Sequence, residues 1–159
     1  MKPSVYVETT IPSYLTAWPS RDLVSAAHQQ ITREWWARRA GFELFLSQLV
    51  HDECRMGDPT AAADRLRAIH GIPLLEQNAE AVALGRDLLA LVPLPLRAAI
   101  DALHVAIAVV HGVDYLLTWN CTHIANAFLR GRIESVCRGA GYDPPTICTP
   151  EELLEGGGP

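Results

Sequence analysis

The sequence has almost no lysine and no long apolar run. Lys2 is the only lysine among 159 residues, so the positive charge of the chain comes almost entirely from arginine. The formal net charge of −5 argues against a protein that grips nucleic acid through a broad basic surface. No apolar stretch approaches the roughly 18 residues that span a bilayer, and the N-terminus lacks the apolar core of a signal peptide. We therefore expect a cytoplasmic protein without a membrane segment.

Several familiar motifs are also missing. The sequence contains no GxGxxG, no GxxxxGK[ST] and no GxSxG, which argues against nucleotide-cofactor folds and α/β-hydrolases. The cysteines form no CxxC pair and have no zinc-ligand spacing, so we expect small core residues at Cys54, Cys121, Cys137 and Cys148. A chain that is 49% hydrophobic and 19% charged is typical of a globular protein. We expect a single domain over 1–159, with a flexible tail at about 156–159.

Apolar patterns of two kinds alternate along the chain and predict strands separated by helices. Strands are expected at 4–7, 42–47, 72–76, 114–119 and 145–150. Helices are expected at 20–39 (begun by Ser20 or Asp22), around Leu49 to Glu53, at 57–71, 78–92, 96–112 and 122–141, with a turn or helix at 150–154. Strands joined by helices form βαβ units, so we predict a three-layer α/β/α sandwich with a central parallel sheet.

Three carboxylates and one amide are expected at the end of the sheet where parallel sheets bind their ligands. Glu8 directly follows the first strand, and Glu53 lies in the helix after the second. Asp101 lies in the first half of the most apolar helix, and Asn120 follows the strand at 114–119. Ligands of such sheets bind beyond the carboxyl ends of the strands, where the strand order reverses. If the first and fourth strands are neighbours, Glu8 and Asn120 enter one cleft.

This set of side chains suits a hard divalent cation, although each acid alone has a simpler explanation. Carboxylates that converge on one cleft repel each other unless a cation such as Mg²⁺ or Mn²⁺ lies between them. A metal held in this way can polarise a phosphodiester and activate a water molecule. Taken alone, a glutamate at a strand end such as Glu8, or in a helix such as Glu53, is more often a solvated surface residue. Asp101 has apolar neighbours on both sides and needs a partner or a metal.

The residues beside these acids are candidates for support of the site or contact with a substrate. Thr9 and Thr10 are expected to hydrogen-bond a ligating carboxylate or a metal-bound water. His104 lies three residues after the aspartate of the apolar helix, on the same helical face. It either orients that carboxylate, contacts a phosphate or is a packed core histidine. His123 and Asn126 either reach the substrate side of the cleft or have no functional role.

The same stretches resemble a known family. The motifs are "VYVETTIPSYL", "SQLVHDEC", "AAIDALHVAIA" and "DYLLTWNCTHIAN", in this order over nearly the whole chain. The most specific part is the pair "DALHVAIA" and "DYLLTWN", separated by "VVHGV". In these segments the chain resembles the PIN domain family, particularly the VapC-like toxin ribonucleases of bacterial type II toxin–antitoxin pairs.

The resemblance implies a fold, an activity and partners. It implies the same α/β/α sandwich, an endoribonuclease that depends on Mg²⁺ or Mn²⁺ and cuts RNA, a homodimer, and inhibition by a small antitoxin protein. The acidic quartet of the family corresponds to Glu8, Glu53, Asp101 and Asn120, with Glu8 and Asp101 as metal ligands and Glu53 bridging through water.

Two positions depart from the family pattern. The family usually has aspartate at both, whereas this chain has Glu8 and Asn120. An amide oxygen brings no charge, so we expect a second metal to bind more weakly. Two alternatives therefore stay open: a scaffold that binds RNA or a protein without cutting, and a metal enzyme that acts on a DNA flap or a small phosphoester.

Overall fold

Five parallel strands form the centre of the molecule. The computed structural model describes residues 1–155, and the tail expected at 156–159 lies outside the described residues. The strand order is β3-β2-β1-β4-β5, and every neighbouring pair is parallel. The strands are β1 (Ser4–Val7), β2 (Glu43–Ser47), β3 (Leu74–Leu75), β4 (Tyr115–Leu117) and β5 (Thr146–Cys148).

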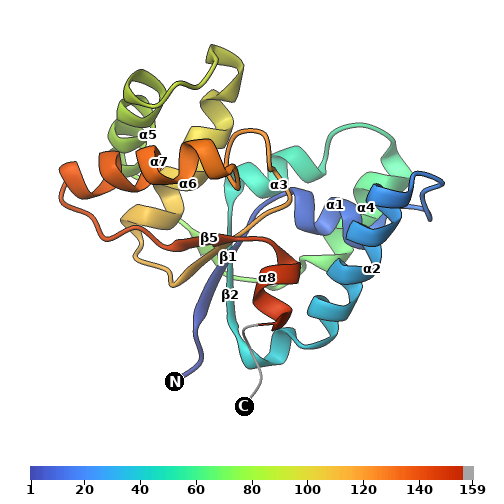
Figure 1. The fold of residues 1–159 in the computed structure, drawn as a ribbon. Coiled ribbons are helices and arrows are strands. Elements are labelled where there is room, and N and C mark those ends of the chain that lie inside the picture. Colours follow the sequence, from blue (N-terminus) through green and yellow to red (C-terminus); the bar gives the residue numbers. More distant parts are fainter. Residues whose placement is uncertain (156–159) are drawn as a thin grey trace.

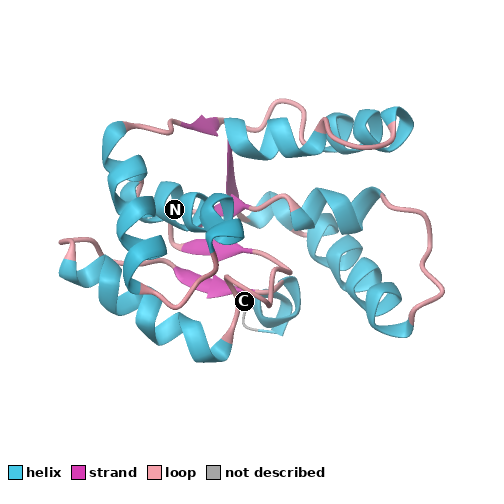
Figure 2. Ribbon diagram, turned by 90° about the horizontal axis from the view of Figure 1, so that it is seen from above, coloured by secondary structure: helices cyan, strands magenta, loops and turns pink. Residues whose placement is uncertain are grey.

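Helices cover both faces of this sheet, which confirms the predicted three-layer α/β/α sandwich. Figure 1 shows α5, α6 and α7 on one side of the sheet and α1, α2, α4 and α8 on the other. Seen from above, the strands form a central column between the two groups (Figure 2). The helices are α1 (Thr10–Thr16), α2 (Leu23–Ala37), α3 (Gln48–Cys54), α4 (Pro59–Ala68), α5 (Ala79–Leu91), α6 (Ala99–Val110), α7 (Ala127–Gly139) and α8 (Pro150–Glu155). No helix within residues 1–155 is long and apolar enough to cross a membrane.

The strand order reverses between β1 and β4. The chain first runs outward from β1 through β2 to β3, and then returns to place β4 on the other side of β1. Val7 lies opposite Leu117 in this pair, and the backbone N–H of Glu8 donates to the carbonyl oxygen of Leu117 at 3.1 Å. The side chain of Glu8 and the loop after β4 therefore start from the same point, as predicted for neighbouring strands.

The opposite end of the same strand pair is fixed by side chains. Asp114 Oδ2 accepts hydrogen bonds from the backbone N–H and the hydroxyl of Ser4, at 2.7 and 2.8 Å. The backbone N–H of Asp114 donates in return to the hydroxyl oxygen of Ser4 at 2.9 Å. These bonds set which residue of β1 faces which residue of β4.

Helix caps lie where the local sequence predicts them. The side chains of Asp58 and Asn78 accept hydrogen bonds from the first turns of α4 and α5. For α2 the cap is Asp22 rather than Ser20, with Ser25 N–H as the donor at 2.8 Å. Gly112 ends α6 with a φ of 65°, a backbone conformation that suits glycine.

Residues 10–16 form α1, where no element is predicted, and Pro12 fits because a proline in the first helical turn leaves no helix hydrogen bond unmade. Two local expectations are wrong. The helix expected at 122–141 begins only at Ala127, where Asn126 caps it after a run of turns. Cys121 is exposed in these turns, whereas the other three cysteines are buried as expected.

Candidate functional site

Glu8 is buried at the carboxyl end of β1 and is held through one oxygen. The residue is 3% exposed. Its Oε2 accepts hydrogen bonds from the backbone N–H and hydroxyl of Thr10 and from the hydroxyl of Thr118, the last at 2.8 Å. Burial raises the pKa of Glu8, because these bonds and the charge of His104 offset only part of the lost hydration.

The same hydroxyls connect Glu8 to the loop after β4. Thr118 Oγ1 accepts from the backbone N–H of Asn120 at 2.9 Å, and Thr10 Oγ1 accepts from the backbone N–H of Trp119 at 2.8 Å. The start of α1 and the end of β4 are therefore joined around one carboxylate. Thr10 supports an acid here, as the sequence predicts, whereas the role of Thr118 was not predicted.

Glu53 is the second acid, and its environment shifts its pKa in the other direction. Its Oε1 lies 2.6 Å from the hydroxyl of Thr9 and 2.5 Å from Nε2 of His104. Burial acts to raise the pKa of Glu53, but the hydrogen bonds from His104 and Thr9 and the charge of His104 outweigh it, so the pKa lies below its usual value. Glu53 is therefore a carboxylate over the physiological pH range.

The histidine that contacts Glu53 belongs to a buried chain of polar groups. His104 is fully buried on α6, and its Nδ1 lies 2.6 Å from the hydroxyl of Tyr6. That hydroxyl also lies 2.7 Å from the hydroxyl of Ser47. Sequence analysis missed Tyr6 and Ser47, although a buried histidine needs a partner for each ring nitrogen and so indicates that a polar neighbour exists.

Asp101 is the third acid and lies nearer to solvent. Its Oδ2 is 2.7 Å from Nδ1 of His123, and the two side chains are 22% and 15% exposed. The backbone N–H of His123 donates to Oδ1 of Asn120 at 3.0 Å. The oxygen of the Asn120 amide therefore shapes the turn that brings His123 to Asp101.

These contacts close on themselves and define what we call the polar ring. Bonds run from Glu8 through Thr118, Asn120 and His123 to Asp101, and one turn of α6 leads from Asp101 to His104. From His104 the ring continues through Glu53 and Thr9 back to Glu8. Its members are Glu8, Thr9, Thr10, Glu53, Asp101, His104, Thr118, Asn120 and His123.

Asn126 is the one predicted site residue outside the ring. Its side-chain oxygen accepts from the backbone N–H of Phe128 at 2.9 Å, and its amide donates to the carbonyl oxygens of Cys121 and Thr122. It caps α7 and holds the preceding turns.

The three acids of the ring share one property that matters for ligand binding. Within residues 1–155, the side-chain hydrogen bonds reach Oε2 of Glu8, Oε1 of Glu53 and Oδ2 of Asp101, and leave the second oxygen of each carboxylate without a protein donor. Carboxylate oxygens without a protein donor are the type of ligand that a hard cation prefers. In the described part of the chain, however, no three His, Cys, Asp or Glu side chains lie close enough together to form a ready-made metal site.

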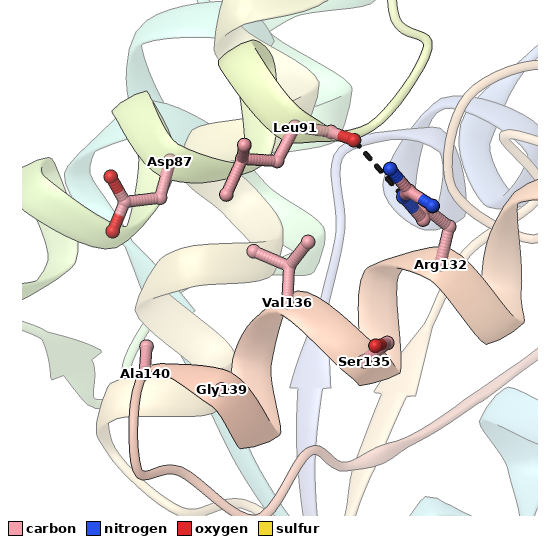
Figure 3. Close-up of a pocket in the computed structure, with 7 residues that line it drawn as sticks. All are labelled: Asp87, Leu91, Arg132, Ser135, Val136, Gly139 and Ala140. Carbon is pink, nitrogen blue, oxygen red and sulfur yellow. Dashed lines mark hydrogen bonds between the residues drawn. The ribbon is translucent and has the colours of Figure 1, made fainter.

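Several hollows on the surface of residues 1–155 lie away from these groups. One of about 390 Å³ lies between α5 and α7 and is shown in Figure 3. There, Arg132 donates to the carbonyl oxygen of Leu91 at 3.1 Å, and Asp87 lies on the far side of Leu91 from Arg132. None of the residues that line this hollow belongs to the polar ring.

Comparison with known proteins does not assign a function to the ring. No protein-family model matches the chain, and no curated protein matches it either. The function has to be argued from the chemistry of the ring.

Proposed function

We propose that the protein is a metal-dependent endoribonuclease that resembles PIN domain toxins and uses the polar ring as its active site. The observation that carries the proposal is that, in the described part of the chain, only one of the two carboxylate oxygens of Glu8, Glu53 and Asp101 has a protein hydrogen-bond donor. Each carboxylate is fixed by protein donors at one oxygen, and the other oxygen remains for a ligand. Exposed acids such as Asp22 and Asp58 also accept at one oxygen only, but they cap helices, whereas these three are buried or partly buried members of one connected network.

The residues that would hold Mg²⁺ or Mn²⁺ are Glu8, Asp101 and Glu53. Mg²⁺ in particular is often bound by only one or two carboxylates, with water and substrate phosphate completing its shell, so a closed protein cage is not required. When bound, such a cation polarises a phosphodiester and lowers the pKa of a water molecule. The opposite pKa shifts of Glu8 and Glu53 give the ring one acid that takes up a proton readily and one that does not.

Exposed arginines next to the acids in sequence support a phosphate-bearing substrate. Arg55 directly follows α3, which carries Glu53, and Arg97 lies in the short 3-10 helix (Leu96–Ala98) just before α6, which carries Asp101. Both side chains are exposed. A guanidinium binds phosphate oxygens as a fork, so a few arginines can seat RNA on an otherwise acidic protein.

The partners in this proposal come from the resemblance to the toxin family. They are RNA as substrate, a small antitoxin protein as inhibitor and a second copy of the chain, all in the cytoplasm. Trp18 and Leu23, which are 90% and 86% exposed beside the start of α2, are apolar surface that a protein partner would cover.

The test is cleavage of labelled RNA by the purified protein in Mg²⁺, in Mn²⁺ and in EDTA. The matched control is Asp101→Asn, which keeps the shape of the side chain and removes its charge. We expect cleavage with either metal, none with EDTA, and loss of cleavage in Asp101→Asn together with weaker Mn²⁺ binding by calorimetry. Unchanged Mn²⁺ binding in Asp101→Asn would contradict the proposal.

The alternative is a PIN-like scaffold that binds RNA or a protein without cutting. The observation in its favour is Asn120, which stands at the fourth acidic position and uses its oxygen in the turn with His123. Bound metal and bound RNA without cleavage, over a panel that includes single-stranded RNA and a DNA flap, would favour this alternative. Cleavage of the flap alone would instead make the protein a DNA nuclease.

A further inference from the structure

Tyr6 carries a hydroxyl where the core has no packing need for one. The residue is fully buried in the middle of β1, between Val5 and Val7, which are also fully buried. Burial raises the pKa of Tyr6, so the hydroxyl keeps its proton. Its two contacts are Ser47 Oγ and His104 Nδ1. A phenylalanine would fill the same space, so the hydroxyl itself needs an explanation.

The hydroxyl of Tyr6 and the carboxylate of Glu53 together fix the ring of His104. Oε1 of the Glu53 carboxylate accepts, so Nε2 of His104 carries a proton and donates it at 2.5 Å. The other ring nitrogen, Nδ1, has the hydroxyl of Tyr6 as its partner at 2.6 Å. If the imidazole of His104 were flipped by 180°, carbon atoms would face both partners. Because the side chain is fully buried, neither nitrogen could then hydrogen-bond to water instead.

We propose that Tyr6 is a positioning residue for Glu53, which acts by holding His104 in the one ring orientation that directs Nε2–H at Oε1 and leaves Oε2 for a ligand. The role rests on the proposed function, because its purpose is to present Glu53 to a cation or substrate. Strand geometry supports it, since Tyr6 and Glu8 are two residues apart and lie on the same face of the sheet. One strand thus provides Glu8 directly and orients Glu53 through His104.

The hydrogen-bond partners of Glu53 show why it needs this support. Glu53 lies on α3, a helix of seven residues, and its side chain is 32% exposed, so it has room for several rotamers. Among the described residues, its side chain is hydrogen-bonded by Thr9 and His104 alone. If the imidazole of His104 lost its fixed orientation, the Thr9 hydroxyl alone would determine which carboxylate oxygen of Glu53 faces the ligand. Mutation of a residue that hydrogen-bonds to a metal ligand commonly lowers the metal affinity by about 10- to 100-fold.

The experiment compares Tyr6→Phe with the matched control Tyr115→Phe. Tyr115 is half-buried in the neighbouring strand β4 and has no hydrogen-bond partner for its hydroxyl in the described part of the chain. NMR of metal-free, histidine-labelled protein detects the Nε2 proton of His104 as a slowly exchanging resonance. We expect this resonance to be lost or broadened in Tyr6→Phe and kept in Tyr115→Phe. Calorimetry with Mn²⁺ should show a Kd raised about tenfold in Tyr6→Phe only.

The outcomes separate this inference from the proposed function. If the His104 resonance and the Mn²⁺ Kd of Tyr6→Phe both equal those of the wild type, Tyr6 is only a core residue and the inference is overturned. If the wild type binds no Mn²⁺, the proposed function fails, and the resonance alone decides the role of Tyr6. Should Tyr6→Phe fail to fold, Ser47→Ala removes the other partner of the same hydroxyl, and we expect a smaller change in the same direction.

Discussion

The polar ring contains two histidine–carboxylate pairs that are held to very different degrees. In the inner pair, His104 lies 2.5 Å from Glu53, is itself fully buried, and has Tyr6 at 2.6 Å behind it. In the outer pair, His123 lies 2.7 Å from Asp101, and both side chains are partly exposed. In the described residues no side chain holds the ring of His123 from behind, and only its backbone N–H is fixed, by Asn120.

This difference indicates which part of the ring is fixed and which part can exchange partners. To release Glu53, the inner pair would leave the buried Nε2 of His104 unpaired, which is costly. Release of Asp101 exposes His123 to water, which can replace the lost hydrogen bond. We therefore expect a ligand to bind by displacing His123 from Asp101, while Glu8 and the inner pair keep their positions.

The largest expected effect is a difference in the free energy of unfolding between variants of the inner and the outer pair. His104→Asn leaves Tyr6 and Glu53 without their buried partner, so we expect a loss of about 3 kcal/mol in the free energy of unfolding. For a chain of this length that lowers the Tm by roughly 6–12 °C. His123→Asn should cost less than about 1 kcal/mol, because its pair is partly solvated. Thermal and urea unfolding measure both, and equal losses would show that the two pairs are equivalent.

Glu8 extends the comparison to an acid with no histidine hydrogen-bonded to it. Since burial raises its pKa, the folded state is more stable with Glu8 protonated, and this stability is lost as the pH rises through the folded-state pKa. We expect Glu8→Gln to raise the free energy of unfolding at neutral pH by about 1 kcal/mol while it abolishes cleavage. The gain should shrink as the pH falls toward that pKa. A control on the exposed Glu43 of β2, Glu43→Gln, should change neither property.

Glu53 should show the opposite dependence on pH. Its pKa is lowered in the folded state, so its stability contribution is present above the ordinary glutamate pKa and is lost as the pH falls through the folded-state value. We expect Glu53→Gln to be less stable than the wild type by about 1 kcal/mol at pH 7. The gap should close as the pH falls below the ordinary glutamate pKa and through the lowered folded-state value. Unfolding curves over this pH range test it, and a gap that widens in acid would mean that His104 does not stabilise the carboxylate.

The last effect is confined to stability and concerns the turns that carry the outer pair. Asn126→Ala removes the cap of α7, which should cost about 1 kcal/mol. Asn126→Asp keeps the capping oxygen but loses the amide that donates to the carbonyl oxygens of Cys121 and Thr122, so it should cost part of this amount. Because Asn126 lies outside the polar ring, the cleavage rate per folded molecule should not change in either variant. A lower rate in Asn126→Asp at unchanged Tm would instead give Asn126 a role in substrate binding.

Local patterns were enough to predict the sheet, the caps and the position of the acids. Buried strands, capping residues such as Asp58 and the rule for carboxyl ends of parallel strands need only short stretches of sequence. The neighbourhood of β1 and β4, which brings Glu8 and Asn120 together, follows from the strand order that this fold class favours.

The pairing of the acids was not predictable, because it depends on how distant elements cross. The spacing of His104 and Asp101 placed them on one helical face, yet each takes a different partner: His104 contacts Glu53, and Asp101 contacts His123. The contact between Tyr6 and His104 joins residues 98 positions apart. Periodicity shows the side of a helix or strand on which a residue lies, but it does not show which side chain arrives from the other layers.

The hydrogen bonds between Ser4 and Asp114 help to fix the register of β1 against β4. A slip of β4 by one residue would turn Thr118 away from Glu8, because successive side chains of a strand point to opposite faces. The same slip would move Asp114 out of hydrogen-bonding distance of Ser4 at the amino end of the strand pair. A slipped register therefore loses hydrogen bonds at both ends of the strand pair, so a β1–β4 pair that is correctly aligned at its amino end also places Thr118 beside Glu8 at its carboxyl end.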